Sequence, residues 1–165
     1  MPVSLRLAEM EVIFDDRYFP LLISTWTGRA DLEAAKWHQE HHRAAIDRAV
    51  SEGLRVVSIS MATRTQRPTP EVRKYWADSM SKTPAAHRAA TLATFVVMTS
   101  AMMRGVMTAI GWLNEEARSI KTYPTLSSAI REGLALLEAE GLECPAGLDP
   151  DAYALPPSEN GRSSA

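Results

Sequence analysis

The sequence has very little of what a disulfide framework, a nucleotide-binding loop or a secretory signal requires. Cysteine occurs once in 165 residues, at Cys144, which excludes a disulfide framework and favours a reducing compartment. No G-x-S-x-G motif, G-x-G-x-x-G motif or other glycine-rich phosphate loop is present, so the sequence predicts neither a catalytic constellation nor a cofactor. Residues 1–9 lack an apolar signal core, and we therefore expect a cytoplasmic protein.

The chain also lacks an excess of charge of either sign. Eighteen Lys and Arg stand against 20 Asp and Glu, for a formal net charge of −2, which does not favour a nucleic-acid partner. The length fits one domain, which we place at residues 1–142. Residues 143–165 are rich in Pro, Gly, Ser and Asp and have few apolar side chains to bury, so they are predicted to form a flexible acidic tail.

One long hydrophobic run is present, from Thr91 to Leu113, and it is long enough to cross a bilayer. However, threonine, serine and glycine dilute it, and Arg104 within the hydrocarbon would cost about 2.5 to 3.5 kcal/mol. The alternative is a soluble strand followed by a helix. Residues 92–98 read as a strand buried on both faces, and Thr99 and Ser100 can cap a helix that begins there. The sequence therefore predicts no membrane span.

Strand-like and helix-like segments alternate along the rest of the chain. The predicted strands cover residues 11–15, 20–27, 54–60, 92–98 and 118–123. The predicted helices begin at residues 31, 69, 100 and 124, and a polar, basic loop is predicted at 62–68. The predicted order is β-β-α-β-α-β-α-β-α in a single α/β domain. Parallel crossovers place the helices on a mixed, mostly parallel sheet, and the first two strands form an antiparallel edge hairpin.

This order of elements resembles the STAS or SpoIIAA-like superfamily of anti-sigma-factor-antagonist domains. The resemblance covers residues 10–137 and rests on the apolar strands at 54–59 and 92–98 and on the closing segment 120–134. It implies a STAS-like fold and a bacterial-type regulatory domain that signals through protein–protein interaction. Family members that switch by phosphorylation carry an Asp-Ser-x-Gly sequence after the third strand. That motif is absent from residues 60–69 here, so a phosphoswitch is not predicted.

A histidine cluster lies in the first predicted helix. His38 and His42 are spaced i, i+4 and can approach each other on one helix face, as zinc ligands often do. No second Cys/His cluster completes a coordination shell, so no metal site is predicted, and these two histidines remain weak candidates for a metal-dependent enzyme. His42 borders the predicted core stripe of the helix and is expected to be hydrogen-bonded there.

The other side of the same helix is a candidate partner surface. Ala34, Trp37, His41 and Arg48 are predicted to point away from the core stripe. Tryptophan and arginine are enriched in the residues that dominate binding energy at protein interfaces. The alternative is an isolated surface aromatic residue, which is common in soluble proteins.

A second candidate is the edge of the sheet where the parallel strands end, because ligands of open α/β sheets bind there. The residues predicted to meet at this edge, as a site for an anion or another ligand, are Ser60, Arg64, Arg67, Ser100 and Arg104. Helix N-termini nearby favour anions. The alternative is a solvated basic loop.

Together these patterns predict a non-enzymatic regulatory or scaffold domain that binds protein, as a homodimer or with another cytosolic partner. The alternative function is the binding of a small molecule, a lipid, nucleotide or other anion, at the carboxyl ends of the parallel strands.

Overall fold

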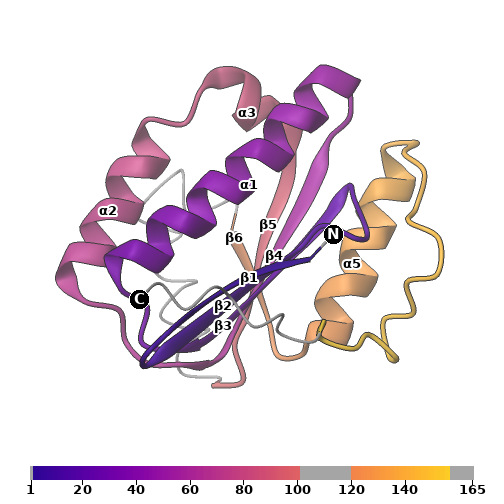
Figure 1. Cartoon of the computed structure of the whole chain (residues 1–165). Helices are drawn as coiled ribbons and strands as arrows, with labels where there is room; N and C mark the ends of the chain where they lie inside the picture. The colour runs from indigo at the N-terminus through magenta and orange to yellow at the C-terminus, as the bar shows by residue number, and fades with distance from the viewer. Residues whose placement is uncertain (1, 101–119, 157–165) are drawn as a thin grey trace.

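A computed structural model shows one six-stranded sheet covered by helices, and it describes residues 2–100 and 120–156 (Figure 1). The strands are β1 (Val3–Leu7), β2 (Met10–Asp15), β3 (Leu21–Gly28), β4 (Val56–Thr65), β5 (Thr91–Val97) and β6 (Ile120–Tyr123). The helices are α1 (Leu32–Glu52), α2 (Pro70–Ser81), α3 (Ala85–Ala90) and α5 (Leu126–Ala139).

The strands lie in the sheet in the order β1-β2-β3-β4-β5-β6, the same as their order in the sequence. β1, β2 and β3 pair antiparallel, and β3, β4, β5 and β6 pair parallel. The mixed α/β sheet with an antiparallel edge is therefore confirmed. The helix predicted at 100–113 lies outside the described residues.

Helices cover both faces of the sheet (Figure 1). α1, α2 and α3 lie on one face, where α1 buries Ile46 and Ala49 against Phe14, Leu22 and Val56 of the sheet. α5 lies on the other face, over a second core. The fully buried large side chains of that core include Leu21, Ile23, Ile59, Phe95, Ile130 and Leu137.

The helices predicted to begin near residues 31, 69 and 124 are present as α1, α2 and α5, and each begins after a residue whose side chain caps it. Asp31 accepts a 2.8 Å hydrogen bond from the Ala34 backbone N–H at the start of α1, and Gly53 ends that helix in the left-handed conformation at φ 66°. Thr69 and Thr125 cap α2 and α5 in the same way, at 3.3 and 3.2 Å. Each cap satisfies a backbone donor that has no partner within its helix.

The structure corrects the predicted elements at three places. β1 was not predicted, and it makes the antiparallel edge a three-stranded meander instead of a hairpin. The loop predicted at 62–68 is wrong in part, because β4 continues to Thr65, which pairs with Gly28 of β3. The short helix α3 was also missed. Strand pairing extended β4 through polar residues whose local sequence favours a loop.

The first part of the hydrophobic run forms β5, whose residues pair with β4 on one side and β6 on the other. Phe95 and Val97 of β5 are almost completely buried, at 0% and 1% exposure. Within residues 2–100 and 120–156, no helix has the length and apolar character needed to cross a bilayer. Arg104 lies outside the described residues.

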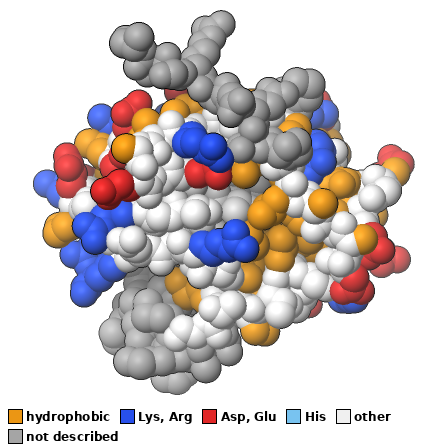
Figure 2. Space-filling view, turned by 60° about the horizontal axis from the view of Figure 1, so that its bottom comes forward, with side chains coloured by type: hydrophobic (Ala, Val, Ile, Leu, Met, Phe, Trp, Pro, Cys, Tyr) orange, Lys and Arg blue, Asp and Glu red, His pale blue; other side chains and the backbone are white. Residues whose placement is uncertain are grey.

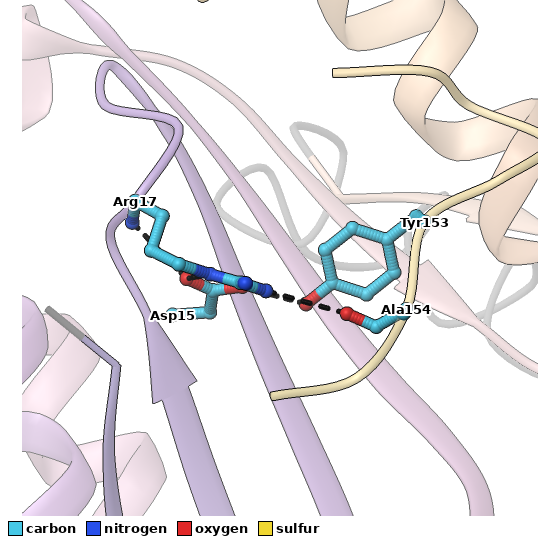
Figure 3. Close-up of polar contacts among 4 residues, drawn as sticks. All are labelled: Asp15, Arg17, Tyr153 and Ala154. Carbon is cyan, nitrogen blue, oxygen red and sulfur yellow. Dashed lines mark hydrogen bonds and ion pairs between the residues drawn. The ribbon is translucent and has the colours of Figure 1, made fainter. Parts of the chain in front are cut away.

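The C-terminal segment contacts the sheet through a buried carboxylate (Figure 3). Asp15, at the end of β2, is 1% exposed and accepts hydrogen bonds from Arg17 Nη2 at 2.7 Å and from the Tyr153 hydroxyl at 2.8 Å. Arg17 also donates to the Ala154 carbonyl at 3.3 Å. Asp151 pairs with Arg131 of α5. The flexibility predicted for residues 143–165 stays a prediction.

Burial by itself would raise the pKa of Asp15 because it penalises the charged carboxylate. The hydrogen bonds from Arg17 and Tyr153 outweigh that effect and hold the pKa below its usual value. Burial and the neighbouring carboxylate raise the pKa of Tyr153. At neutral pH the cluster therefore consists of a charged Asp15, a charged Arg17 and a neutral tyrosine that donates its proton.

Removing the Tyr153 hydroxyl is expected to destabilise the protein. Tyr153→Phe deletes a hydrogen bond to a buried charged oxygen, which costs about 1 to 3 kcal/mol. Urea unfolding at pH 7 measures the change. Tyr18→Phe is the control, because it removes the same group from a ring that lies 6.1 Å from the Tyr153 ring and should change stability by less than about 0.5 kcal/mol. Equal stability of Tyr153→Phe and wild type would show that the hydrogen bond from Tyr153 to Asp15 adds nothing to the stability of the fold.

Candidate functional site

Helix α1 is rotated against the sheet differently from the prediction. Ala34, predicted to point outward, is fully buried at 0% exposure, and Trp37 is half-buried. Ala34 is buried in a hydrophobic cluster with Met10 and Val12 of β2 and Val72 of α2. Leu5 and Leu7 of β1 pack in the same hydrophobic cluster as Ala34 and Trp37.

The rings of Trp37 and His41 are in close, tilted contact on the β1 side of α1. Their ring centroids lie 4.1 Å apart with the planes 36° from parallel. His41 Nδ1 lies 2.8 Å from the Trp37 carbonyl oxygen, which can only accept, so Nδ1 carries the proton and donates. This hydrogen bond orients the His41 ring, and in the neutral imidazole Nε2 is left as an acceptor.

Arg48 lies two helical turns beyond His41 on the same side of α1. Its guanidinium carbon is 3.9 Å from the centroid of the Phe19 ring, and its Nε donates to Glu52 at 2.8 Å. The Arg48 side chain is 52% exposed. The cation–π contact fixes the planar guanidinium while its outer N–H groups stay accessible to solvent.

The structure therefore brings the three predicted partner residues together. Trp37, His41, Ala44 and Arg48 follow the spacing i, i+4, i+7, i+11, which places them in one stripe about 16 Å long. Ala44 and Arg48 are exposed, and Trp37 and His41 are half-buried. We call these four residues the α1 stripe.

The two remaining histidines of α1 turn toward the sheet. His38 Nε2 lies 2.7 Å from Ser24 Oγ of β3, and His42 Nε2 lies 2.8 Å from Ser58 Oγ of β4. The two imidazoles stack at 5.7 Å. Trp26 lies 4.8 Å from the His38 ring, so the pair sits in a largely apolar layer. The prediction that His42 borders the core and is hydrogen-bonded there is confirmed.

Burial keeps both imidazoles neutral. Desolvation, with smaller repulsion from His42 and His41, lowers the pKa of His38 to about 3. Desolvation and the charge of His87 lower the pKa of His42 to about 4. Both values lie well below the ordinary value of 6.5, so the two groups are unprotonated at neutral pH.

The serine–histidine pairs have the spacing of a nucleophile and its base, but their hydroxyls are buried. Ser24 is 4% exposed and Ser58 is 7% exposed, so a substrate cannot reach either oxygen. The pairs are explained as polar groups satisfied between a helix and a sheet. Among the described residues, no group of three or more His, Cys, Asp or Glu side chains could hold a metal ion.

The residues of the predicted anion site at the strand ends are more widely spread than those of the α1 stripe. Ser60 lies within β4 and is paired with Ser24 of β3 and Val96 of β5, and Arg64 is opposite Thr27 of β3. Arg64, Arg67 and Ser100 are exposed, and Arg104 lies outside the described residues. Figure 2 views this end of the molecule. Lys and Arg side chains are spread over the face, and hydrophobic side chains gather on one part of it.

A cavity that the sequence did not indicate lies on the other flank of α1. It has a volume of about 470 Å³ and is bounded by α1, α2, α3 and the amino-terminal halves of β5 and β6. Its lining includes His42 and Ile46 of α1 and Arg88 of α3. No pattern in the sequence marks it, because its residues come from five separate elements.

Comparison with solved structures supports the fold. An uncharacterized DUF3478-family protein with a SpoIIAA-like fold from Shewanella loihica PV-4 is 10% identical, with a TM-score of 0.57 over 78% of this chain and 97% of that one. An anti-sigma factor antagonist from Mycobacterium paratuberculosis is 15% identical, with a TM-score of 0.47 over 78% and 98%. No protein-family model and no curated protein matches the sequence. The SpoIIAA-like fold predicted from the sequence is confirmed by the first of these structures.

Proposed function

We propose that this protein is a non-enzymatic regulatory module of the cytosol that binds other proteins through the α1 stripe. The partner we propose first is a second copy of the same chain, which would make a homodimer. The observation that carries the proposal is the close contact between the Trp37 and His41 rings, with His41 oriented by a hydrogen bond, beside the Arg48–Phe19 contact. Side chains that are already held in place lose little conformational entropy when a partner binds.

The chemistry of the stripe fits a protein interface. The indole offers apolar area, His41 Nε2 offers an acceptor, and Arg48 offers N–H donors that Glu52 does not occupy. Tryptophan and arginine are the side chains most often found at the energetic centre of such interfaces. The exposed methyl group of Ala44 leaves room for a partner to approach the helix closely.

The titratable groups elsewhere support a non-enzymatic role. His38 and His42 are bonded to buried serines, and Asp15 is engaged by Arg17 and Tyr153. A general acid or base must reach a substrate proton. These groups instead serve contacts within the fold.

Size-exclusion chromatography with light scattering tests the interface. We expect wild type to be a dimer and Ala44→Arg to be a monomer, because a long charged side chain in the middle of the stripe blocks close approach. Ala77→Arg is the matched control, since it introduces the same side chain at an exposed position inside α2 and should leave the dimer intact.

If wild type stays monomeric at a concentration of about 100 µM, any dimer has a dissociation constant above that value, and the homodimer is contradicted. Pull-downs from cells with wild type, Ala44→Arg and Ala77→Arg as baits then test whether the stripe binds a different protein. Capture that Ala44→Arg and Ala77→Arg both retain would contradict the α1 stripe as the binding surface.

A further inference from the structure

The 470 Å³ cavity beside α1 has the size and position of a small-molecule site. Ligand sites in proteins typically enclose about 300 to 1,000 Å³. The cavity lies beneath the flank of α1 opposite the α1 stripe, and its residues play no part in the proposed function. Its described lining residues are Gln39, His42, Arg43, Ile46, Ser79, Met80, Thr83, Pro84, His87, Arg88, Thr91, Leu92, Ala93, Thr94 and Ile120.

The lining divides into an apolar part and a cationic rim. Ile46, Ala93 and Ile120 bring aliphatic surface from α1, β5 and β6. Arg43 of α1 and Arg88 of α3 are exposed at the rim. The described lining contains no Asp or Glu, and the Asp47 carboxylate next to it is engaged by His87 Nε2 at 2.7 Å.

Both arginines have N–H groups that are not used in hydrogen bonds between described residues. Arg88 uses Nη1 for a 2.7 Å hydrogen bond to the Thr83 carbonyl, which holds the side chain near the rim and leaves its Nε and Nη2 groups for a ligand. Arg43 has no ion pair with any Asp or Glu in the described parts of the chain. Two such groups can bind a carboxylate, because guanidinium N–H groups match its two oxygens.

We propose that this cavity binds an amphipathic monoanion, a carboxylate with an aliphatic body, with the carboxylate at Arg43 and Arg88 and the aliphatic chain against Ile46, Met80 and Ile120. The charge of the rim selects the anion, and the apolar lining selects the chain. The cavity lies at the amino-terminal halves of β5 and β6. This site is therefore distinct from the predicted anion site at the carboxyl ends of the strands.

Isothermal titration calorimetry with monomeric decanoate tests the proposal. Wild type should bind decanoate saturably, and Arg43→Glu/Arg88→Glu should weaken binding at least tenfold. Arg64→Glu/Arg67→Glu is the matched control, because it reverses two exposed arginines at the carboxyl end of β4 and should bind as wild type does. Decyltrimethylammonium, which has the same chain and the opposite charge, should not bind. Thermal unfolding of each variant confirms that it is folded.

The location is tested by the NMR signals of the methionine methyl groups. Decanoate should shift the signal of Met80, assigned through Met80→Leu, because this side chain lines the cavity. Unchanged affinity in Arg43→Glu/Arg88→Glu, or loss only in Arg64→Glu/Arg67→Glu, would overturn the proposal.

Two further outcomes also overturn it. Absence of binding at millimolar decanoate would show that the cavity does not accept an aliphatic carboxylate. Sedimentation with phosphatidylglycerol vesicles without binding of monomeric decanoate would place an anion-binding surface at a membrane instead.

Discussion

Between pH 7 and pH 5 the free energy of unfolding is expected to fall by about 2 to 4 kcal/mol, because His38 and His42 take up protons only when the protein unfolds. Their pKa values are about 3 and 4 in the folded protein and 6.5 in the unfolded chain. A group with a lowered folded pKa binds more protons unfolded, so acid favours unfolding. At pH 5, about 1.5 units below 6.5, each histidine contributes up to about 2 kcal/mol.

The direction and the pH window follow from the two values. Well above pH 6.5 the imidazoles are neutral in both the folded and the unfolded state, and these two groups cost no stability. Stability is lost as the pH falls from 6.5 toward 4, because the unfolded chain takes up protons there while burial keeps both imidazoles of the folded protein neutral. Urea unfolding at pH 7.5, 6 and 5 measures the loss.

Variants assign the effect to the pair. His38→Gln/His42→Gln keeps a polar group for each serine and should flatten the dependence of stability on pH, although it lowers stability at pH 7.5. His41→Gln is the matched control, because it leaves both sheet-facing imidazoles in place. The explanation fails if the double variant keeps the full loss between pH 7.5 and pH 5.

Gly28→Ala should destabilise the protein by more than about 3 kcal/mol, enough to leave much of it unfolded. Gly28 ends β3 with φ at +82°, where residues other than glycine are strained, and a Cβ atom there would lie 2.0 Å from the Glu9 carbonyl oxygen. That oxygen belongs to the β1–β2 turn, so the edge of the sheet would have to move. Thermal unfolding and the yield of soluble protein report the effect.

Gly53→Ala separates the effect of backbone strain from the effect of a steric clash. Gly53 also has a positive φ, +66°, but no atom lies within 4 Å of the position of its Cβ. Only the left-handed conformation is then unfavourable, at about 1 kcal/mol. Similar stabilities of the two variants would show that the β1–β2 turn yields easily to the added methyl group.

The local features of the fold could be predicted because they depend on neighbours in the sequence. Asp31, Thr69 and Thr125 mark helix starts through hydrogen bonds that span three residues, and the apolar run at 92–98 marks the strand β5. The edge strand β1 was missed because its partly polar residues become a strand only when they pair with β2.

The candidate sites show the same division. The spacing of Trp37, His41 and Arg48 placed them on one side of a helix, but which part of that side is covered depends on the neighbouring strands and on α2. Residues far apart in the chain meet in the Asp15–Tyr153 contact and in the cavity, and no local pattern records such meetings.

The sequence by itself determined the alternation of strands and helices, the capped helix ends and the paired spacing of the histidines, because these follow from short-range periodicity and hydrogen bonding. Only the tertiary structure decided how α1 is rotated against the sheet, which serines form hydrogen bonds with His38 and His42, and where the cavity lies. Those outcomes depend on how elements distant in sequence pack against one another, and packing is settled by the shapes of both partners together.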